Sequence, residues 1–118
     1  MSAGENTRPN LLILTTKGPK SGKPHVTPLV YLEDNGRLCV FASKGGNPKN
    51  PAWYHNLLPN PDGQIELKGE TFNARATIAD PAERDRIYAT QGAKAPNFLE
   101  YQSQTNRTIP VVILERTF

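Results

Sequence analysis

Short apolar runs, separated by glycine, proline and asparagine, recur along the whole chain. Runs of this length with alternating apolar and polar positions are typical of strands rather than of helices. They predict strands over residues 10–16, 25–32, 37–42, 64–68, 71–79 and 109–115. In the fifth of these, the alternate apolar residues predict one inward face, made of Phe72, Ala74, Ala76 and Ile78. The last run, IPVVILE, is apolar almost throughout and predicts a strand covered on both faces.

Turn sequences indicate that neighbouring strands pair as hairpins. The sequence DNG at residues 34–36 separates the second predicted strand from the third, and Asn-Gly adopts the positive φ angles of a tight hairpin turn. The sequence GE at residues 69–70 joins the fourth strand to the fifth. Pro28 interrupts the second strand, so we expect that strand to lie at an edge or to contain a bulge.

Three short helices are expected between the strands. Asn50 can cap the first, with Pro51 at its first position, and this helix ends before Pro59. The sequence DPAE at residues 80–83 combines a cap, a proline and a capping-box glutamate, and predicts a helix to about residue 91. A third helical segment covers residues 96–104.

Hairpin-linked strands with few helices disfavour a doubly wound sheet. A closed barrel is the economical alternative, because closure removes exposed sheet edges. We therefore predict a mainly β (α+β) fold, a six-stranded antiparallel barrel with short flanking helices. Residues 10–118 are expected to form this single domain, after a flexible N-terminal tail at residues 1–9.

Composition adds mild constraints. The net charge of +3 permits an acidic ligand or a membrane surface without calling for nucleic acid. A single cysteine, Cys39, lies in an apolar run and predicts a buried structural thiol. We expect a cytoplasmic protein, since the polar N-terminus has no export signal and no apolar run is long enough to span a bilayer.

The stretch TTKGPKSGKPHVTP at residues 15–28 resembles a nucleotide P-loop but departs from it. The glycines lie one residue too close together, and Pro24 replaces the Ser or Thr that would hold magnesium. A strand follows where a P-loop requires a helix. An NTPase is therefore disfavoured, although the loop can still bind an anion.

A second loop, ASKGG at residues 42–46, also has anion-binding character. Its two glycines free the backbone to turn amides toward a ligand, and Lys44 adds a charge. If both loops lie at one mouth of the barrel, they form an anion cradle for a phosphate or carboxylate, made of Lys20, Ser21, Ser43, Lys44 and Lys49. A plain glycine turn with a solvated lysine is the alternative.

The aromatic residues allow two interpretations each. Trp53 either anchors the core or lines a flat ligand, and Tyr101 with Phe98 either packs on the sheet or roofs a pocket. No metal-ligand cluster and no nucleophile with a neighbouring base are evident, so we expect no metal site. A cofactor would then carry any reaction.

Taken in order, several segments resemble the deazaflavin-dependent nitroreductase family: LLILTTKGPKSGKPHVTPLVYL, ASKGGNPKNPAWYHNL, NPDGQIELKGETFNARA and EYQSQTNRTIPVVILE. The resemblance covers residues 11–115 and implies a split β-barrel of the FMN-binding type. It implies coenzyme F-420, an 8-hydroxy-5-deazaflavin with a phosphodiester and an oligoglutamate tail, as cofactor. The reduced cofactor would pass a hydride to a quinone or nitroaromatic acceptor.

The resemblance also assigns residues to the site. The cofactor phosphate and tail would be held by Lys20, Ser21, Ser43, Lys44, Gly45 and Gly46. Pro28 and Ala42 would lie beside the deazaflavin ring, and Trp53 and Asn56 on a helix next to it. Tyr101 matches an aromatic position on the substrate side and is the candidate catalytic residue.

Some positions depart from the family pattern. Pro19 replaces a basic residue, while Val30 and Phe98 replace tyrosines, so we expect weak reduction of nitroimidazoles. An FMN-dependent oxidoreductase and a non-catalytic cofactor or tetrapyrrole carrier on the same barrel are the alternatives. Dimerisation is left open, and membrane contact is expected only through a quinone substrate.

Overall fold

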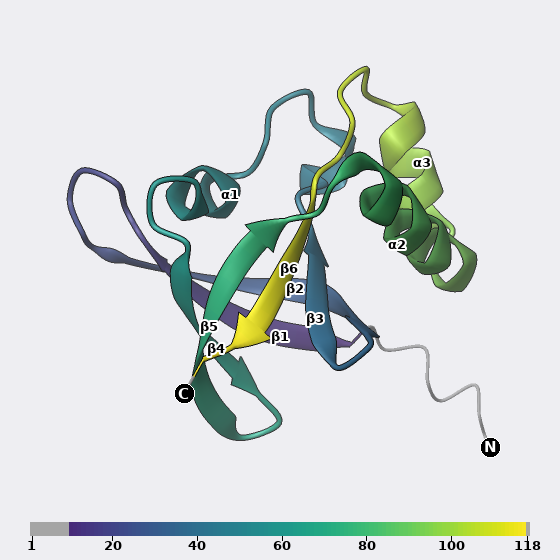
Figure 1. Cartoon of the computed structure of the whole chain (residues 1–118). Coiled ribbons are helices and arrows are strands. Elements are labelled where there is room, and N and C mark those ends of the chain that lie inside the picture. The colour runs from purple at the N-terminus through teal and green to yellow at the C-terminus, as the bar shows by residue number, and fades with distance from the viewer. Residues whose placement is uncertain (1–9, 118) are drawn as a thin grey trace.

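A computed structural model describes residues 10–117, so the predicted tail at residues 1–9 lies outside the described residues. The six strands are β1 (Leu11–Lys17), β2 (Pro24–Asp34), β3 (Arg37–Phe41), β4 (Asp62–Leu67), β5 (Glu70–Ile78) and β6 (Val111–Arg116). They form a closed antiparallel barrel in the order β1-β2-β3-β6-β5-β4 (Figure 1). The predicted fold class and all six strands are confirmed, with shifts of a residue or two at most ends.

The helical elements are η2 (Lys44–Gly46), α1 (Ala52–Leu57), α2 (Pro81–Lys94) and α3 (Asn97–Ser103). Figure 1 shows α2 and α3 together beside β3, while α1 lies apart from them. No helix in the described part of the chain is long and apolar enough to cross a membrane.

Strands β1 and β2 form a long arm. Among residues 10–117, the part of β2 before Tyr31 pairs with β1 on one side and has no strand on its other side. Pro28 lies opposite Ile13 of β1, whereas β2 pairs with β3 only from Tyr31 onward. A proline is tolerated there because β2 needs no ladder donor on its free side. The predicted edge position of Pro28 is confirmed, and so is the hairpin turn, with φ of 54° at Asn35 and 80° at Gly36.

Strand β6 separates two hydrophobic clusters. Val112 and Leu114 point into the barrel, while Val111 and Ile113 pack outside it with residues of α2 and α3. The prediction of a strand covered on both faces is confirmed. Cys39 belongs to the outer cluster, and burial raises the pKa of its thiol to about 11, as expected for a structural cysteine.

The predicted inward face of β5 is wrong at one position. Phe72, Ala74 and Ala76 pack against the barrel core, but Ile78 is 40% exposed. Ile78 is the last residue of β5, where the chain leaves the barrel for α2.

The cap of α2 was predicted correctly and that of α1 was not. The Asp80 carboxylate accepts a hydrogen bond from the Glu83 amide at 2.8 Å. Helix α2 nevertheless continues three residues beyond the predicted end. At α1 the cap position is Pro51, and the Asn50 side chain instead accepts a hydrogen bond from Arg107 at 2.8 Å.

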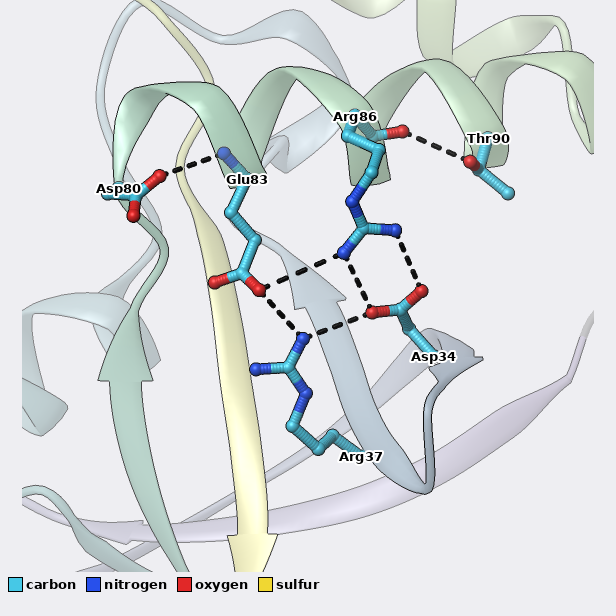
Figure 2. Close-up of polar contacts among 6 residues, drawn as sticks. All are labelled: Asp34, Arg37, Asp80, Glu83, Arg86 and Thr90. Atoms are coloured by element: carbon cyan, nitrogen blue, oxygen red, sulfur yellow. Dashed lines mark hydrogen bonds and ion pairs between the residues drawn. The ribbon is translucent and has the colours of Figure 1, made fainter.

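Charged residues fasten α2 to the β2–β3 hairpin, as Figure 2 shows. The Arg86 guanidinium donates to both carboxylate oxygens of Asp34 at 3.0 Å, and Arg37 bridges Asp34 (3.1 Å) to Glu83 (2.8 Å). The Arg86 hydrogen bond is the main reason that the pKa of Asp34 falls to about 2, and Arg37 lowers it further against the effect of burial. Glu83 thus serves this network rather than the reciprocal bond of a capping box.

Candidate functional site

A cavity of about 390 Å³ lies outside the barrel, between the β1–β2 arm, the η2 turn, α1 and α3. Its walls come from elements that are far apart in the sequence: Leu11, Thr27, Pro28, Leu29, Val30, Phe41, Ser43, Lys44, Gly45, Pro51, Trp53, Asn97, Phe98 and Tyr101. Most of these are apolar or aromatic, and the charge comes from Lys44 in the lysine–glycine turn, residues 43–46. A site of this size with a few polar groups on an apolar wall suits a small organic ligand.

The cavity brings together six of the residues proposed from the sequence. They are Pro28, Ser43, Lys44, Gly45, Trp53 and Tyr101. Trp53 is 4% exposed and belongs to the barrel core, as the first interpretation predicts. It also borders the cavity, where its contact with a flat ligand stays a prediction. Phe98 is likewise a buried member of the outer cluster with a face on the cavity.

Lys20 and Ser21 do not line this cavity. They lie at the free tip of the β1–β2 arm, which Figure 1 shows on the side of the barrel away from α2 and α3. The tip is closed on itself, since the Gly22 amide donates to the Gly18 carbonyl at 3.0 Å and the Ser21 hydroxyl accepts from the Lys23 amide at 3.2 Å. Four residue steps, from Pro24 to Pro28, separate this tip from the cavity residue Pro28 by about 13 Å of extended strand. The two loops therefore do not form one compact cradle.

Ala42 and Asn56 are buried beside the site rather than in it. Ala42 has no exposed surface, and its amide donates to the Pro110 carbonyl at 3.0 Å. The Asn56 side chain donates to the Thr16 hydroxyl at 3.1 Å and so ties α1 to β1. Both residues support the walls of the cavity without lining it.

The lysine–glycine turn has an unusual backbone. Lys44, Gly45 and Gly46 all have positive φ angles, of 46°, 62° and 83°. The Gly46 amide is not free for a ligand, because it donates to the Ser43 carbonyl at 2.9 Å. Gly46 instead allows a close approach of α3, since a Cβ atom there would lie 2.9 Å from the Tyr101 carbonyl oxygen. Its role is thus packing, whereas Ser43, Lys44 and Gly45 face the cavity.

Tyr101 is the hydroxyl-bearing aromatic residue on the α3 wall. Its hydroxyl oxygen accepts a hydrogen bond from the Asn97 side-chain amide at 3.0 Å, and its ring packs edge-on against Phe98 with centroids 5.4 Å apart. Because the oxygen is the acceptor, the hydroxyl hydrogen is available to a second partner. Sequence reasoning missed Asn97, although its spacing of four residues from Tyr101 on one helix face could have identified it.

A larger cavity, of about 670 Å³, lies between the tip of the same arm and strands β4 and β5. It is lined by Thr15, Lys17, Gly22, Pro24, Asp62, Gly63, Gln64, Asn73 and Thr117. It contains no aromatic side chain and none of the site residues proposed from the sequence. The smaller cavity is therefore the better candidate site. No group of three or more His, Cys, Asp or Glu side chains within residues 10–117 could hold a metal ion.

A closed six-stranded barrel with an outer cavity that joins an aromatic wall to a lysine–glycine turn is typical of split-barrel, cofactor-dependent oxidoreductases. The chain matches the family model described as F420H(2)-dependent quinone reductase over residues 3–116. An F420H(2)-dependent quinone reductase of Mycobacterium tuberculosis strain H37Rv is 40% identical over 111 residues, which cover 92% of this chain and 74% of that protein. The chain belongs to the F420H(2)-dependent quinone reductase family.

Solved structures agree with this assignment. An F420-H2 dependent reductase, FDR-A, superposes with a TM-score of 0.81 and 36% identity, covering 90% of this chain and 94% of that one. A second structure, described as a domain-swapped dimer, has a TM-score of 0.82 and 34% identity over 98% of this chain and 87% of that one. The resemblance inferred from the sequence and the split-barrel fold are thereby confirmed.

Proposed function

We propose that this chain binds reduced coenzyme F-420 in the 390 Å³ cavity and uses it to reduce quinones. One observation carries the proposal: the cavity combines flat apolar walls with a cationic turn. Family membership supports the same cofactor and the same class of acceptor.

The residues present fit the two ends of the cofactor. Pro28, Trp53 and Tyr101 offer apolar or aromatic surface to a flat ring, and Lys44 with the Ser43 and Gly45 backbone offers positive charge to a phosphate. When bound, the reduced deazaflavin supplies the hydride. The chain orients both reactants and surrounds them with low-dielectric side chains.

An elongated ligand can use both lysine-bearing loops in succession. Lys44 borders the cavity itself, whereas the exposed Lys20 and Ser21 lie further along the arm. We assign Lys44 to the cofactor phosphate and Lys20 with Ser21 to the distal part of the anionic tail. Exposed lysines attract such a tail chiefly through charge, so this contact should weaken with added salt.

Tyr101 is the candidate donor to the acceptor. A quinone oxygen gains negative charge as the ring is reduced, and the Tyr101 hydroxyl can donate to it while Asn97 holds the hydroxyl oxygen. Within residues 10–117 no carboxylate or imidazole lines the cavity, so the one proton that completes the hydroquinone after hydride transfer comes from water or from this hydroxyl with later exchange.

A fluorescence titration of oxidised F-420, with FMN as the parallel ligand, tests the assignment. We expect saturable binding of F-420 and weaker binding of FMN. Stopped-flow or steady-state assays should then show quinone-dependent oxidation of F420H2. A nitroimidazole should be reduced more slowly, because Phe98 lacks the hydroxyl of a tyrosine. Binding of FMN alone would replace the deazaflavin by a flavin, and tight binding without turnover would indicate a carrier.

We also infer that the chain forms a homodimer through the exposed apolar face of the β1–β2 arm, which borders the cavity at Leu11 and Pro28. Leu11, Ile13 and Val26 are exposed there, with Val26 at 62%, and a relative of similar structure is described as a domain-swapped dimer. Light scattering coupled to size-exclusion chromatography measures the mass directly. A Val26→Lys variant should shift a dimer toward monomer, and a wild-type mass near 13 kDa would contradict the inference.

A further inference from the structure

Arg107 joins the segment before β6 to the loop that follows β3. Its Nη2 donates to the Ser43 carbonyl at 2.9 Å, its Nε to the Asn47 carbonyl at 2.9 Å, and its Nη1 to the Asn50 side chain at 2.8 Å. One planar guanidinium thus contacts the beginning, middle and end of residues 43–50. Ser43 and the following turn line the cofactor cavity.

None of the three acceptors carries a charge. Other arginines, such as Arg37 and Arg86, form ion pairs with Asp34 and Glu83. Arg107 has no ion pair within residues 10–117. Arg107 is half-buried, and burial lowers the pKa of its guanidinium, yet an arginine stays protonated in proteins. A positive charge without a counter-ion therefore lies directly behind the lysine–glycine turn.

The segment that carries Arg107 is itself held in place. The Gln102 side chain of α3 donates to the Arg107 carbonyl at 2.7 Å and accepts from the Ile109 amide at 3.0 Å. Arg84 of α2 donates to the Ile109 carbonyl at 2.9 Å and to the same Gln102 oxygen. Two helices consequently fix the backbone from which the guanidinium extends.

The turn needs such support because Lys44 has a φ of 46°, in the left-handed region that non-glycine residues rarely adopt. A strained residue persists only when its surroundings determine its conformation. The carbonyl that precedes it, on Ser43, accepts hydrogen bonds from both Arg107 and the Gly46 amide. Arg107 therefore restrains the strained turn at its first residue.

We propose that Arg107 is a positioning residue for cofactor recognition, which holds the turn in its anion-binding shape and adds an unpaired positive charge behind it. In this way it favours a deazaflavin with a phosphate-bearing tail over the same chromophore without one. This inference rests on the proposed function of the cavity. Local sequence gives no sign of it, because the three partners lie 57 to 64 residues away.

Binding constants for two ligands test the inference: F-420 and the deazaflavin that lacks the phosphodiester and glutamates. We expect Arg107→Gln to weaken F-420 binding by about 10- to 100-fold, because it removes both the charge and the fork of donors. The tail-less compound should change by less than about 3-fold, since it presents no anion to the turn. Arg107→Lys should fall between wild type and Arg107→Gln for F-420, because lysine keeps the charge but not the planar fork.

Arg75→Gln is the matched control, since Arg75 is an exposed arginine whose ion pair with Asp62 lies away from the cavity. It should leave both binding constants unchanged. Thermal unfolding of each variant monitors the fold, and Arg107→Lys carries the test if Arg107→Gln does not fold. In steady-state assays Arg107→Gln should raise the KM for F420H2 and leave kcat largely intact.

The outcomes separate the two proposals. Wild-type protein that binds neither deazaflavin contradicts the proposed function, and the positioning role falls with it. Wild-type protein that binds F-420, with equal loss of both ligands in Arg107→Gln and Arg107→Lys, overturns the positioning role and leaves the function standing. Unchanged F-420 binding in Arg107→Gln overturns it as well.

Discussion

The Asn97 side chain donates a hydrogen bond to the Tyr101 hydroxyl oxygen at 3.0 Å, one helical turn away on α3. In this contact the hydroxyl oxygen acts as a hydrogen-bond acceptor, so the hydroxyl hydrogen remains available to donate to a ligand in the cavity. The pair therefore presents an oriented donor on a wall that is otherwise aromatic or apolar.

Tyr101→Phe should lower kcat for quinone reduction while leaving the Kd for F-420 nearly unchanged. Loss of one donor to the developing oxyanion should cost roughly 10-fold in rate, or about 1.4 kcal/mol of activation free energy. Steady-state kinetics with saturating F420H2 measure this change. Asn97→Ala serves as the companion variant and should have a smaller effect, because the hydroxyl remains; an unaltered kcat in Tyr101→Phe would exclude the donor role.

Lys44 combines a useful charge with an unfavourable backbone. Lys44→Gly should raise the free energy of unfolding by about 1 kcal/mol, because glycine adopts a positive φ without steric cost. The same variant should weaken F-420 binding, since the charge at the cavity is lost. Lys44→Ala should weaken binding to a similar extent without the gain in stability. Urea denaturation and fluorescence titration separate the two effects, and a destabilised Lys44→Gly would argue against strain at this position.

Gly46→Ala tests how closely α3 approaches the turn. A Cβ atom there would lie 2.8 Å from the Gln104 side-chain oxygen and 2.9 Å from the Tyr101 carbonyl oxygen, at a φ of 83°. We expect a loss of about 2–3 kcal/mol in the free energy of unfolding, from strain and steric overlap together.

Gly69→Ala is the matched control for that substitution. Gly69 has nearly the same φ, 82°, but a Cβ atom there would meet nothing within 4 Å. It should cost only about 1 kcal/mol, the backbone contribution alone. Similar losses in the two variants, measured by urea denaturation, would mean that the contact with α3 has no effect on stability.

The Asp34 network makes stability depend on acidity. The folded pKa of Asp34, about 2, is below the ordinary value of 3.8, so its ionised form stabilises the fold above about pH 4. That contribution is lost as the pH falls through about 2. Asp34→Asn should therefore be less stable than wild type at pH 7, by about 1 kcal/mol after allowance for solvent screening. The difference in urea midpoint between wild type and Asp34→Asn should shrink between pH 4 and pH 2. A difference that stays constant would mean that the asparagine side chain, and not the lost charge, destabilises the variant.

Tail length distinguishes the two lysine-bearing loops. Lys20→Ala should weaken binding of F-420 with a long oligoglutamate tail and spare the form with a short tail, because Lys20 lies at the tip of the arm. Lys44→Ala should weaken both forms, since Lys44 borders the cavity itself. Salt titrations of the two variants with each form provide the measurement. An equal loss for both forms in Lys20→Ala would contradict a distal contact.

Patterns within a few residues predicted most of the fold. Alternation of apolar residues identified the strands, and the Asn35–Gly36 pair identified the hairpin turn, because both signals depend on local backbone geometry. The choice between Asn50 as a helix cap and as a partner of Arg107 could not be made locally, because a guanidinium more than fifty residues away decides it. The distance between the arm tip and the lysine–glycine turn could not be predicted locally either, because it depends on how far the β1–β2 arm extends past the barrel.

The sequence identified some residues that line the cavity and others that are buried behind its wall. Pro28, Lys44 and Tyr101 line the cavity, whereas Ala42 and Asn56 are turned into neighbouring structure. The direction of a side chain near a strand or helix end depends on what packs against it, and that information is spread over the whole chain.

The place of β6 in the barrel also bears on how the protein is made. This strand comes last in the described chain, yet it pairs with β3 on one side and β5 on the other. Ribosomal synthesis therefore exposes two unpaired strand edges until residues 111–116 have emerged. Arg107 and α3 leave the ribosome only shortly before them, so barrel closure and assembly of the lysine–glycine turn belong to the same late stage of folding.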